Sequence, residues 1–339
     1  MNTIAAVYGS TVIYWNSLII VLGIAAGLCL SLSLCRIQSV SKAAVVSCFP
    51  FLLLFSLAFG RFLHWYSNSE LYTSFASAMM NHRLGGYCIV GVVPAALLSA
   101  RIVRLFGLTK RTGALLDVIA PGMTLALAFV RLSALFAAFC RSKVPVTNPL
   151  FQRLPFAVAS VDTAGNVEYR LATFFLSFLA LILITAFAVV FIQRTKDRVY
   201  VRGAGNQGNA ANIVLLLCCA VEILLDSTRS DASMLNFFLL GFLNKYVSFV
   251  SVGMLFCAVY ILFVFLHYIK RSIKSSGKIW GAVLLIFAFV VTVVGAGLSE
   301  YFVQRYTGMF LLYRSLQGVS VLLMVIVVFA AYKRCVIEK

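Results

Sequence analysis

Charged residues are scarce in this chain of 339 residues, and acidic ones are the scarcest. Only 11% of the residues are Asp, Glu, Lys or Arg, against about 25% in soluble domains, whereas 62% are apolar. This shortage excludes a soluble fold. Paired cysteine spacing is also lacking, because the nine cysteines show no pattern of a zinc site or a disulfide framework. We interpret them as small packing residues and expect no metal and no other cofactor.

The apolar residues occur in blocks long enough to cross a ~30 Å hydrocarbon core, which takes roughly 20 helical residues. The blocks are too continuous for barrel strands, and in lipid each helix satisfies its own backbone amides. The sequence therefore predicts an all-α, polytopic transmembrane helical bundle of about nine spans. The expected spans are approximately 12–34, 44–65, 85–106, 115–139, 171–192, 211–226, 246–266, 280–298 and 309–332. The first has no basic segment before it and is interpreted as a retained helix.

The basic residues are divided unequally between the two sets of loops. Most of the 28 Lys and Arg residues lie in the loops after spans one, three, five and seven and in the tail, where acids are rare. The opposite loops carry both signs of charge. By the positive-inside rule the basic side is cytoplasmic, so we expect the amino terminus outside and the carboxyl terminus inside. The net charge of +18 then needs no nucleic acid as a partner.

Two longer polar stretches interrupt the spans, the outer loop 141–170 and the inner loop 194–212, and the inner one is predicted to be flexible. The loop 141–170 contains Pro145, Pro149 and Pro155 and a turn cluster around Gly165, which predicts a small ordered cap or hairpin. No internal repeat is present, so an inverted-repeat transporter gains no support. The last two spans follow a strongly basic linker. We therefore divide the chain into a membrane domain, 1–268, and a linker with a carboxyl-terminal hairpin of spans, 269–339.

Arg131 lies inside the fourth expected span, with apolar residues on both sides. A charge near the bilayer centre costs at least ~2.5 to 3.5 kcal/mol, so such a residue usually faces a cavity, a partner or a ligand. One interpretation is that Arg131 reaches the outer headgroups or pairs with Glu222 or Asp226. The other is that it binds an anionic group such as a lipid phosphate, which guanidinium donors match well.

Glu222 and Asp226 are one helical turn apart, so their carboxylates share one face of the short sixth span, and Arg229 follows at its end. These acids are either ion-pair partners for the arginines of other spans or a source of a catalytic base, because burial raises a carboxylate pKa. Arg61 and His64 share one side of the second span. That pair is either an interfacial anchor or a headgroup-binding or catalytic element.

The order of these features resembles the prolipoprotein diacylglyceryl transferases, bacterial inner-membrane enzymes that lipidate the lipobox cysteine of preproteins. The resemblance covers about residues 10–265, and the last two spans lie outside the family's usual seven-helix plan. Asp117, Pro121 and Arg131 have the family's spacing from the Asp and Pro of helix four to its signature arginine. Other matching residues are Ile13, Tyr14, Trp15, Gly23, Gly27, Gly60, Arg61, Gly85, Gly86, Gly91, Pro155, Phe156, Ala157, Val158, Asp226 and Arg229.

The chain departs from the family pattern at several polar positions. Apolar residues follow Arg131 where the family continues with Gly-Asn and further polar residues. The family's His, its first-helix Tyr, a second Tyr and a second essential Arg are replaced by Val90, Asn16, Cys218 and Glu222, respectively.

The resemblance implies transfer of diacylglycerol from phosphatidylglycerol to the lipobox thiol, with glycerol phosphate released and a thioether formed. A cation must stabilise the departing phosphate, a contribution of ~3 to 4 kcal/mol per donor. Arg131, with Arg61 and Arg229, is implied in phosphate binding. The thiolate is the nucleophile, and its base would come from His64, Glu222 or Asp226.

The implied partners are phosphatidylglycerol or another anionic phospholipid, membrane lipid and signal-peptide-bearing preproteins, at the bacterial plasma membrane. The replaced His, Asn and Arg also leave open a catalytically degenerate paralogue that binds lipid or lipopeptide. A different membrane function, such as transport, is the third alternative.

Overall fold

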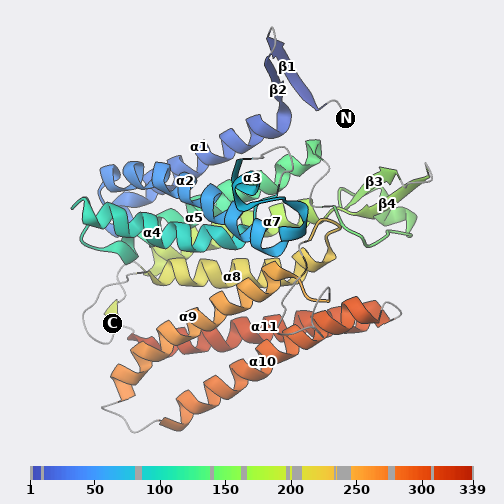
Figure 1. Cartoon of the computed structure of the whole chain (residues 1–339). Coiled ribbons are helices and arrows are strands. Elements are labelled where there is room, and N and C mark those ends of the chain that lie inside the picture. Colours follow the sequence, from blue (N-terminus) through green and yellow to red (C-terminus); the bar gives the residue numbers. More distant parts are fainter. Residues whose placement is uncertain are drawn as a thin grey trace.

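The structure is a computed structural model that describes residues 3–8, 11–80, 86–137, 141–161, 166–195, 199–200, 208–232, 234, 246–273, 279–306 and 309–337. Within these ranges, eight helices are long and apolar enough to span a membrane, which confirms the polytopic helical bundle (Figure 1). They are α1 (Trp15–Gln38), α2 (Lys42–Ser67), α5 (Thr112–Ser133), α7 (Thr173–Thr195), α8 (Asn209–Leu225), α9 (Phe249–Ile273), α10 (Ile279–Arg305) and α11 (Phe310–Cys335).

The third expected span is shorter than the sequence suggested. Its helix is α4 (Val92–Leu105) of 14 residues, preceded by the 3-10 turn η3 (Ile89–Gly91). At 1.5 Å per residue α4 is about 21 Å long, less than the hydrocarbon core. The backbone at Gly91 is packed against α2, since a Cβ on Gly91 would lie 2.4 Å from the Gly60 nitrogen. The span count of nine and the orientation stay predictions.

Short elements occupy the loops. The hairpin predicted in the loop 141–170 is confirmed by β3 (Ala157–Val161) and β4 (Val167–Leu171), which pair antiparallel. Residues expected at the start of the first span instead form strand β2 (Thr11–Tyr14), which pairs with β1 (Ile4–Tyr8). The remaining elements are η1 (Ser69–Leu71), α3 (Phe75–Met80), η4 (Ala134–Phe136), α6 (Pro149–Gln152), η5 (Asp226–Thr228), and the paired strands β5 (Val199–Tyr200) and β6 (Val336–Ile337).

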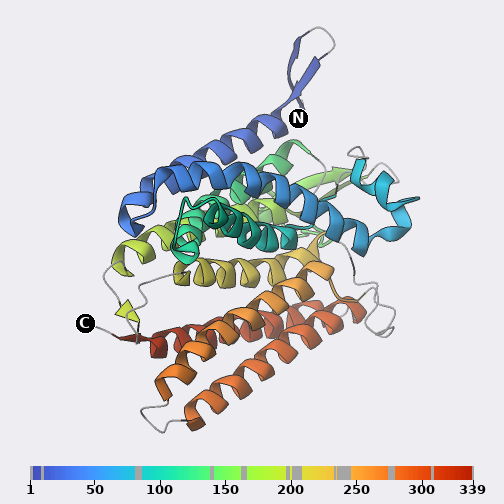
Figure 2. The same ribbon diagram turned by 60° about the vertical axis from the view of Figure 1, so that its left-hand side comes forward.

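The helices form two groups with α8 between them (Figures 1 and 2). One buried cluster lies mainly in α1, α2, α4 and α5, with one residue each from α7 and α8, and another joins α8, α9, α10 and α11. α1 and α5 pack closely, because a Cβ on Gly27 would lie 2.4 Å from the carbonyl oxygen of Gly122. The α10–α11 pair, which we call the C-terminal hairpin, packs against α8 and α9.

Candidate functional site

Arg131 and Glu222 form a buried ion pair between α5 and α8. Nη2 of Arg131 lies 2.7 Å from both carboxylate oxygens of Glu222. The side chains are only 9% and 2% exposed, respectively, so solvent screens the pair little. Of the interpretations of Arg131 offered by the sequence, the structure shows pairing with Glu222.

Asp117 links the same two helices at their other end. The N-cap residue of α8, Gly208, has no side chain to cap the helix. Asp117 supplies this cap from α5: its Oδ2 accepts from the Gly208 amide at 2.7 Å, and its Oδ1 accepts from the Ala211 amide at 2.8 Å. A carboxylate here satisfies orphan amides and complements the positive end of the helix dipole.

The two links show how α5 and α8 lie relative to one another. Gly208 and Glu222 are each 91 positions beyond their partners, Asp117 and Arg131. The helices therefore run parallel and in register over about 21 Å. The Asp and Arg that the family resemblance selected thus both attach α5 to α8. Pro121 lies inside α5 between them.

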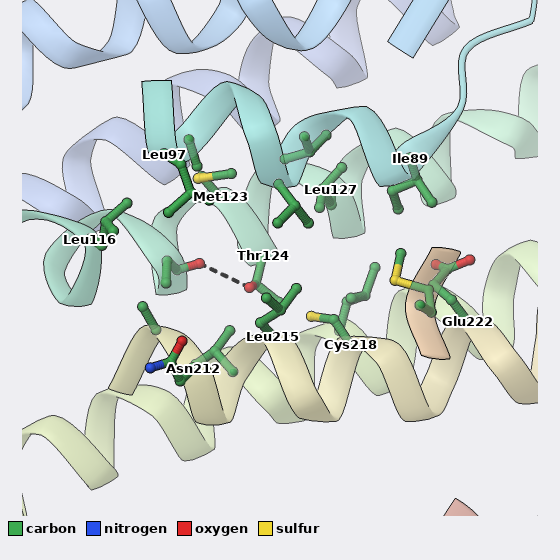
Figure 3. Close-up of a pocket in the computed structure, with 18 of the residues that line it drawn as sticks. Ile89, Leu97, Leu116, Met123, Thr124, Leu127, Asn212, Leu215, Cys218 and Glu222 are labelled. Carbon is green, nitrogen blue, oxygen red and sulfur yellow. Dashed lines mark hydrogen bonds between the residues drawn. The ribbon is translucent and has the colours of Figure 1, made fainter. Parts of the chain in front are cut away.

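An apolar cavity of about 120 Å³ lies between α4, α5 and α8, and Leu181 of α7 and Met254 and Tyr260 of α9 also line it. Its walls are largely aliphatic, and Figure 3 shows side chains from the three helices facing one another. Asn212 and Glu222 are near opposite ends of the cavity, and Thr124 donates to the Ala120 carbonyl at 2.9 Å. The carboxylate that pairs with Arg131 is therefore also part of the cavity wall.

Asp226 and Arg229 lie in the turn that follows α8. Nη1 of Arg229 donates to Oδ1 of Asp226 at 2.8 Å, and its other donors reach Asp231 at 2.9 and 3.0 Å. Oδ2 of Asp226 accepts a short hydrogen bond from the Ser248 hydroxyl. Asp226 is 1% exposed, so a second compensated charge lies one turn beyond Glu222.

Arg61 and His64 organise a different segment. Buried Arg61 donates from Nε to the Ala78 carbonyl at 2.6 Å and from Nη1 to the Gly86 carbonyl at 2.9 Å. His64 Nδ1 is 3.2 Å from the Tyr72 hydroxyl. Gly86 has a φ of +80°, and a Cβ there would lie 2.1 Å from Nε2 of His64, so glycine is required. These contacts join α2 to α3 and the entry of α4.

The predicted glycines have mixed outcomes. Gly86 and Gly91 both lie at close approaches to α2, whereas Gly85 lies outside the described residues. The roles proposed for the charged residues are not tested by these contacts, and they stay predictions.

Sequence reasoning missed several residues that contact this region. Ser248 bridges Asp226 to α10, and the C-terminal hairpin supplies Glu300, Gln304, Arg314 and Gln317. One signal was present, since the two of these polar residues in each helix are four apart (Glu300 and Gln304) and three apart (Arg314 and Gln317), which places each pair on one helix face.

No curated protein matches the chain at a significant level. The family profile described as prolipoprotein diacylglyceryl transferase matches residues 3–269, which is well over half of the chain. The chain is therefore a multi-pass membrane protein that belongs to the prolipoprotein diacylglyceryl transferase family.

Proposed function

We propose that this protein transfers diacylglycerol from phosphatidylglycerol to the lipobox cysteine of preproteins in the bacterial plasma membrane. The observation that carries the proposal is the buried Arg131–Glu222 pair beside an apolar cavity, in a chain of this family. A lipid substrate needs both features, because its acyl chains are apolar and its phosphate is anionic.

In this proposal the cavity and the ion pair bind different parts of the lipid substrate. Aliphatic side chains of α4, α5 and α8 accept part of an acyl chain, while Arg131 accepts the phosphate. Guanidinium groups bind phosphate with strong charge-assisted hydrogen bonds. An incoming phosphate competes with Glu222 for Arg131, and this exchange leaves the carboxylate able to accept a proton.

The reaction then proceeds by substitution at carbon. The cysteine thiol gives its proton to Glu222. The resulting thiolate attacks the carbon of the diacylglycerol unit that is bonded to the phosphate oxygen. The new C–S bond forms as the C–O bond to phosphate breaks, and glycerol phosphate leaves with the electron pair. Arg131 stabilises the charge on this leaving group, the kind of contribution that is usually the largest in such sites.

The other predicted residues have supporting roles in this proposal. Arg229 and Arg61 add positive charge for the phosphate, and Asp226 and His64 are alternative proton acceptors. Arg229 directly follows η5, one turn further along the chain than Asp226, whereas Arg61 and His64 belong to the segment between α2 and α4. We therefore rank Arg131 and Glu222 first.

Complementation tests the activity directly. The gene is expressed in a bacterium depleted of its own diacylglyceryl transferase, and a lipobox preprotein is analysed by mass spectrometry. We expect the thioether-linked diacylglyceryl mass with the wild-type chain and its loss with Arg131→Ala. An absent product despite normal membrane levels of the wild-type chain would reject the transferase.

Lipid binding without catalysis is the second candidate. Glu222 favours this candidate. It stands at the position of a second essential arginine in the family pattern, and it neutralises Arg131 instead of adding a second positive charge. A photoreactive phosphatidylglycerol that labels residues of α5 or α8, together with failed complementation, would support this candidate. Failed complementation without labelling of α5 or α8 would reject both the transferase and the lipid-binding candidate.

A further inference from the structure

The C-terminal hairpin lies beyond residues 3–269, which the family profile matches. Between residues 279 and 332 it contains only three charged residues, Glu300, Arg305 and Arg314. Polar groups in a span are costly and usually have partners inside the bundle. A simple membrane anchor has no need of buried polar residues, yet Glu300 and Gln317 are each 0% exposed. Their contacts are therefore informative.

The hairpin holds the backbone that directly follows Glu222. Gln317 Nε2 donates to the Ile223 carbonyl at 3.3 Å. Arg314 donates from Nη2 to the Ser227 hydroxyl at 2.8 Å and from Nη1 to Gln317. Both helices of the hairpin contribute, because Gln304 of α10 donates to the Ser227 carbonyl at 3.0 Å.

A second chain of hydrogen bonds reaches Asp226. The Glu300 carboxylate accepts from the Ser248 amide at 2.9 Å, and the Ser248 hydroxyl donates to Asp226. Lys143, in the loop before β3, donates to Gln304 at 2.6 Å and connects that loop to the same network. The turn from Ile223 to Thr228 is thus fixed from several sides.

We propose that the C-terminal hairpin is a positioning element for the site, with Arg314 and Gln317 as positioning residues for Glu222. They fix the last turn of α8, and with it the place at which the Glu222 carboxylate meets Arg131. Polar contacts between helices in lipid are directional, so they set the rotation of α8 more strictly than apolar packing does. The kinetic part of this proposal rests on the proposed function.

A double-variant cycle tests the positioning. We expect Gln317→Leu to lower kcat of diacylglyceryl transfer about 10- to 100-fold with a smaller change in KM, because a small displacement near the reacting groups is costly. In a Glu222→Gln background the same substitution has little further effect. A merely structural role would instead lower activity by equal factors in both backgrounds. Equal factors would overturn the proposal.

Thermal unfolding of the four proteins gives a readout that does not need activity. Glu222→Gln lowers the Tm of the wild-type protein, and we expect a drop at most half as large in the Gln317→Leu background, where the pair is already displaced. Equal drops would overturn the positioning even if the wild type proved inactive. Absence of wild-type activity with unequal drops would reject only the proposed transferase.

Arg305→Gln is the matched control. Arg305 is on the same hairpin and is exposed, and it contacts Tyr301 of its own helix and Tyr306 just beyond the helix end. We expect wild-type kcat and Tm for this variant. A loss equal to that of Gln317→Leu would show that any change in the hairpin disturbs the site, against the proposal.

Discussion

The two ends of the α5–α8 pair are joined by different chemistry. At one end the Asp117 carboxylate accepts from two backbone amides of α8, and at the other Arg131 pairs with the Glu222 side chain. Backbone donors are present whatever the sequence of α8, whereas the ion pair depends on one residue. Only the second end has its charged group in the wall of the cavity. We infer that the Asp117 end is structural and the Arg131 end functional.

The largest expected effect breaks the Arg131 end. Arg131→Met leaves Glu222 buried without its cation, which costs about 3–5 kcal/mol of stability. The double variant Arg131→Met/Glu222→Met should recover most of this loss, because apolar side chains replace both charges. Thermal or denaturant unfolding in lipid nanodiscs measures the values. Additive losses in the double variant would contradict an ion pair.

A smaller effect is expected at the Asp117 end. Asp117→Ala removes the cap of α8, a change that costs about 0.5–2 kcal/mol in other helices. Hydrogen exchange at the first turn of α8 should increase, since its amides lose their acceptors. Unchanged exchange there would argue against the cap.

Asp117→Asn sharpens the comparison further. The amide keeps one acceptor oxygen for the α8 amides but loses the charge that complements the helix dipole, so we expect a loss below that of Asp117→Ala, near 0.3–1 kcal/mol. The same unfolding assay ranks the two variants. A loss as large as that of Arg131→Met would show that the two ends do not differ.

The smallest effect concerns Lys143, which contacts the hairpin at the Arg131 end. Partial burial and then the positive charge of Arg314 lower the pKa of Lys143 below its usual 10.5. The folded protein therefore releases this proton at lower pH than the unfolded chain, and stability rises as pH increases between the lowered pKa and 10.5. Lys143→Gln should remove this small rise in Tm. If Lys143→Gln kept the wild-type dependence of Tm on pH, the lowered pKa of Lys143 would not be the cause of the rise.

The sequence predicted what depends on local pattern. Long apolar runs correctly indicated all eight of the long apolar helices in the described residues, with starts within three and ends within seven residues of those observed, and turn residues indicated the β3–β4 hairpin. It placed Glu222 among the possible partners of Arg131, because a buried charge needs compensation. The 14-residue α4 was overestimated, since the apolar residues before it form a turn that packs on α2.

The remaining features depend on contacts between distant segments. The cap by Asp117 spans 91 positions, and its only local sign is that the N-cap residue of α8, Gly208, has no capping side chain. The cavity depends on how α4, α5 and α8 pack against one another, which the periodicity of apolar residues does not specify. The contacts of Arg314 and Gln317 with α8 likewise became visible only when the hairpin was placed beside it.

The most direct test compares the two ends by activity. Purified wild type, Asp117→Asn and Arg131→Gln are reconstituted into phosphatidylglycerol liposomes with a lipobox peptide, below the Tm of every variant, and thioether product is counted per folded protein. Our account predicts that Asp117→Asn keeps activity within about threefold of wild type, as for a change confined to stability. It predicts a loss of at least about 100-fold for Arg131→Gln, as when a leaving-group donor is removed. Full activity of Arg131→Gln would contradict the account.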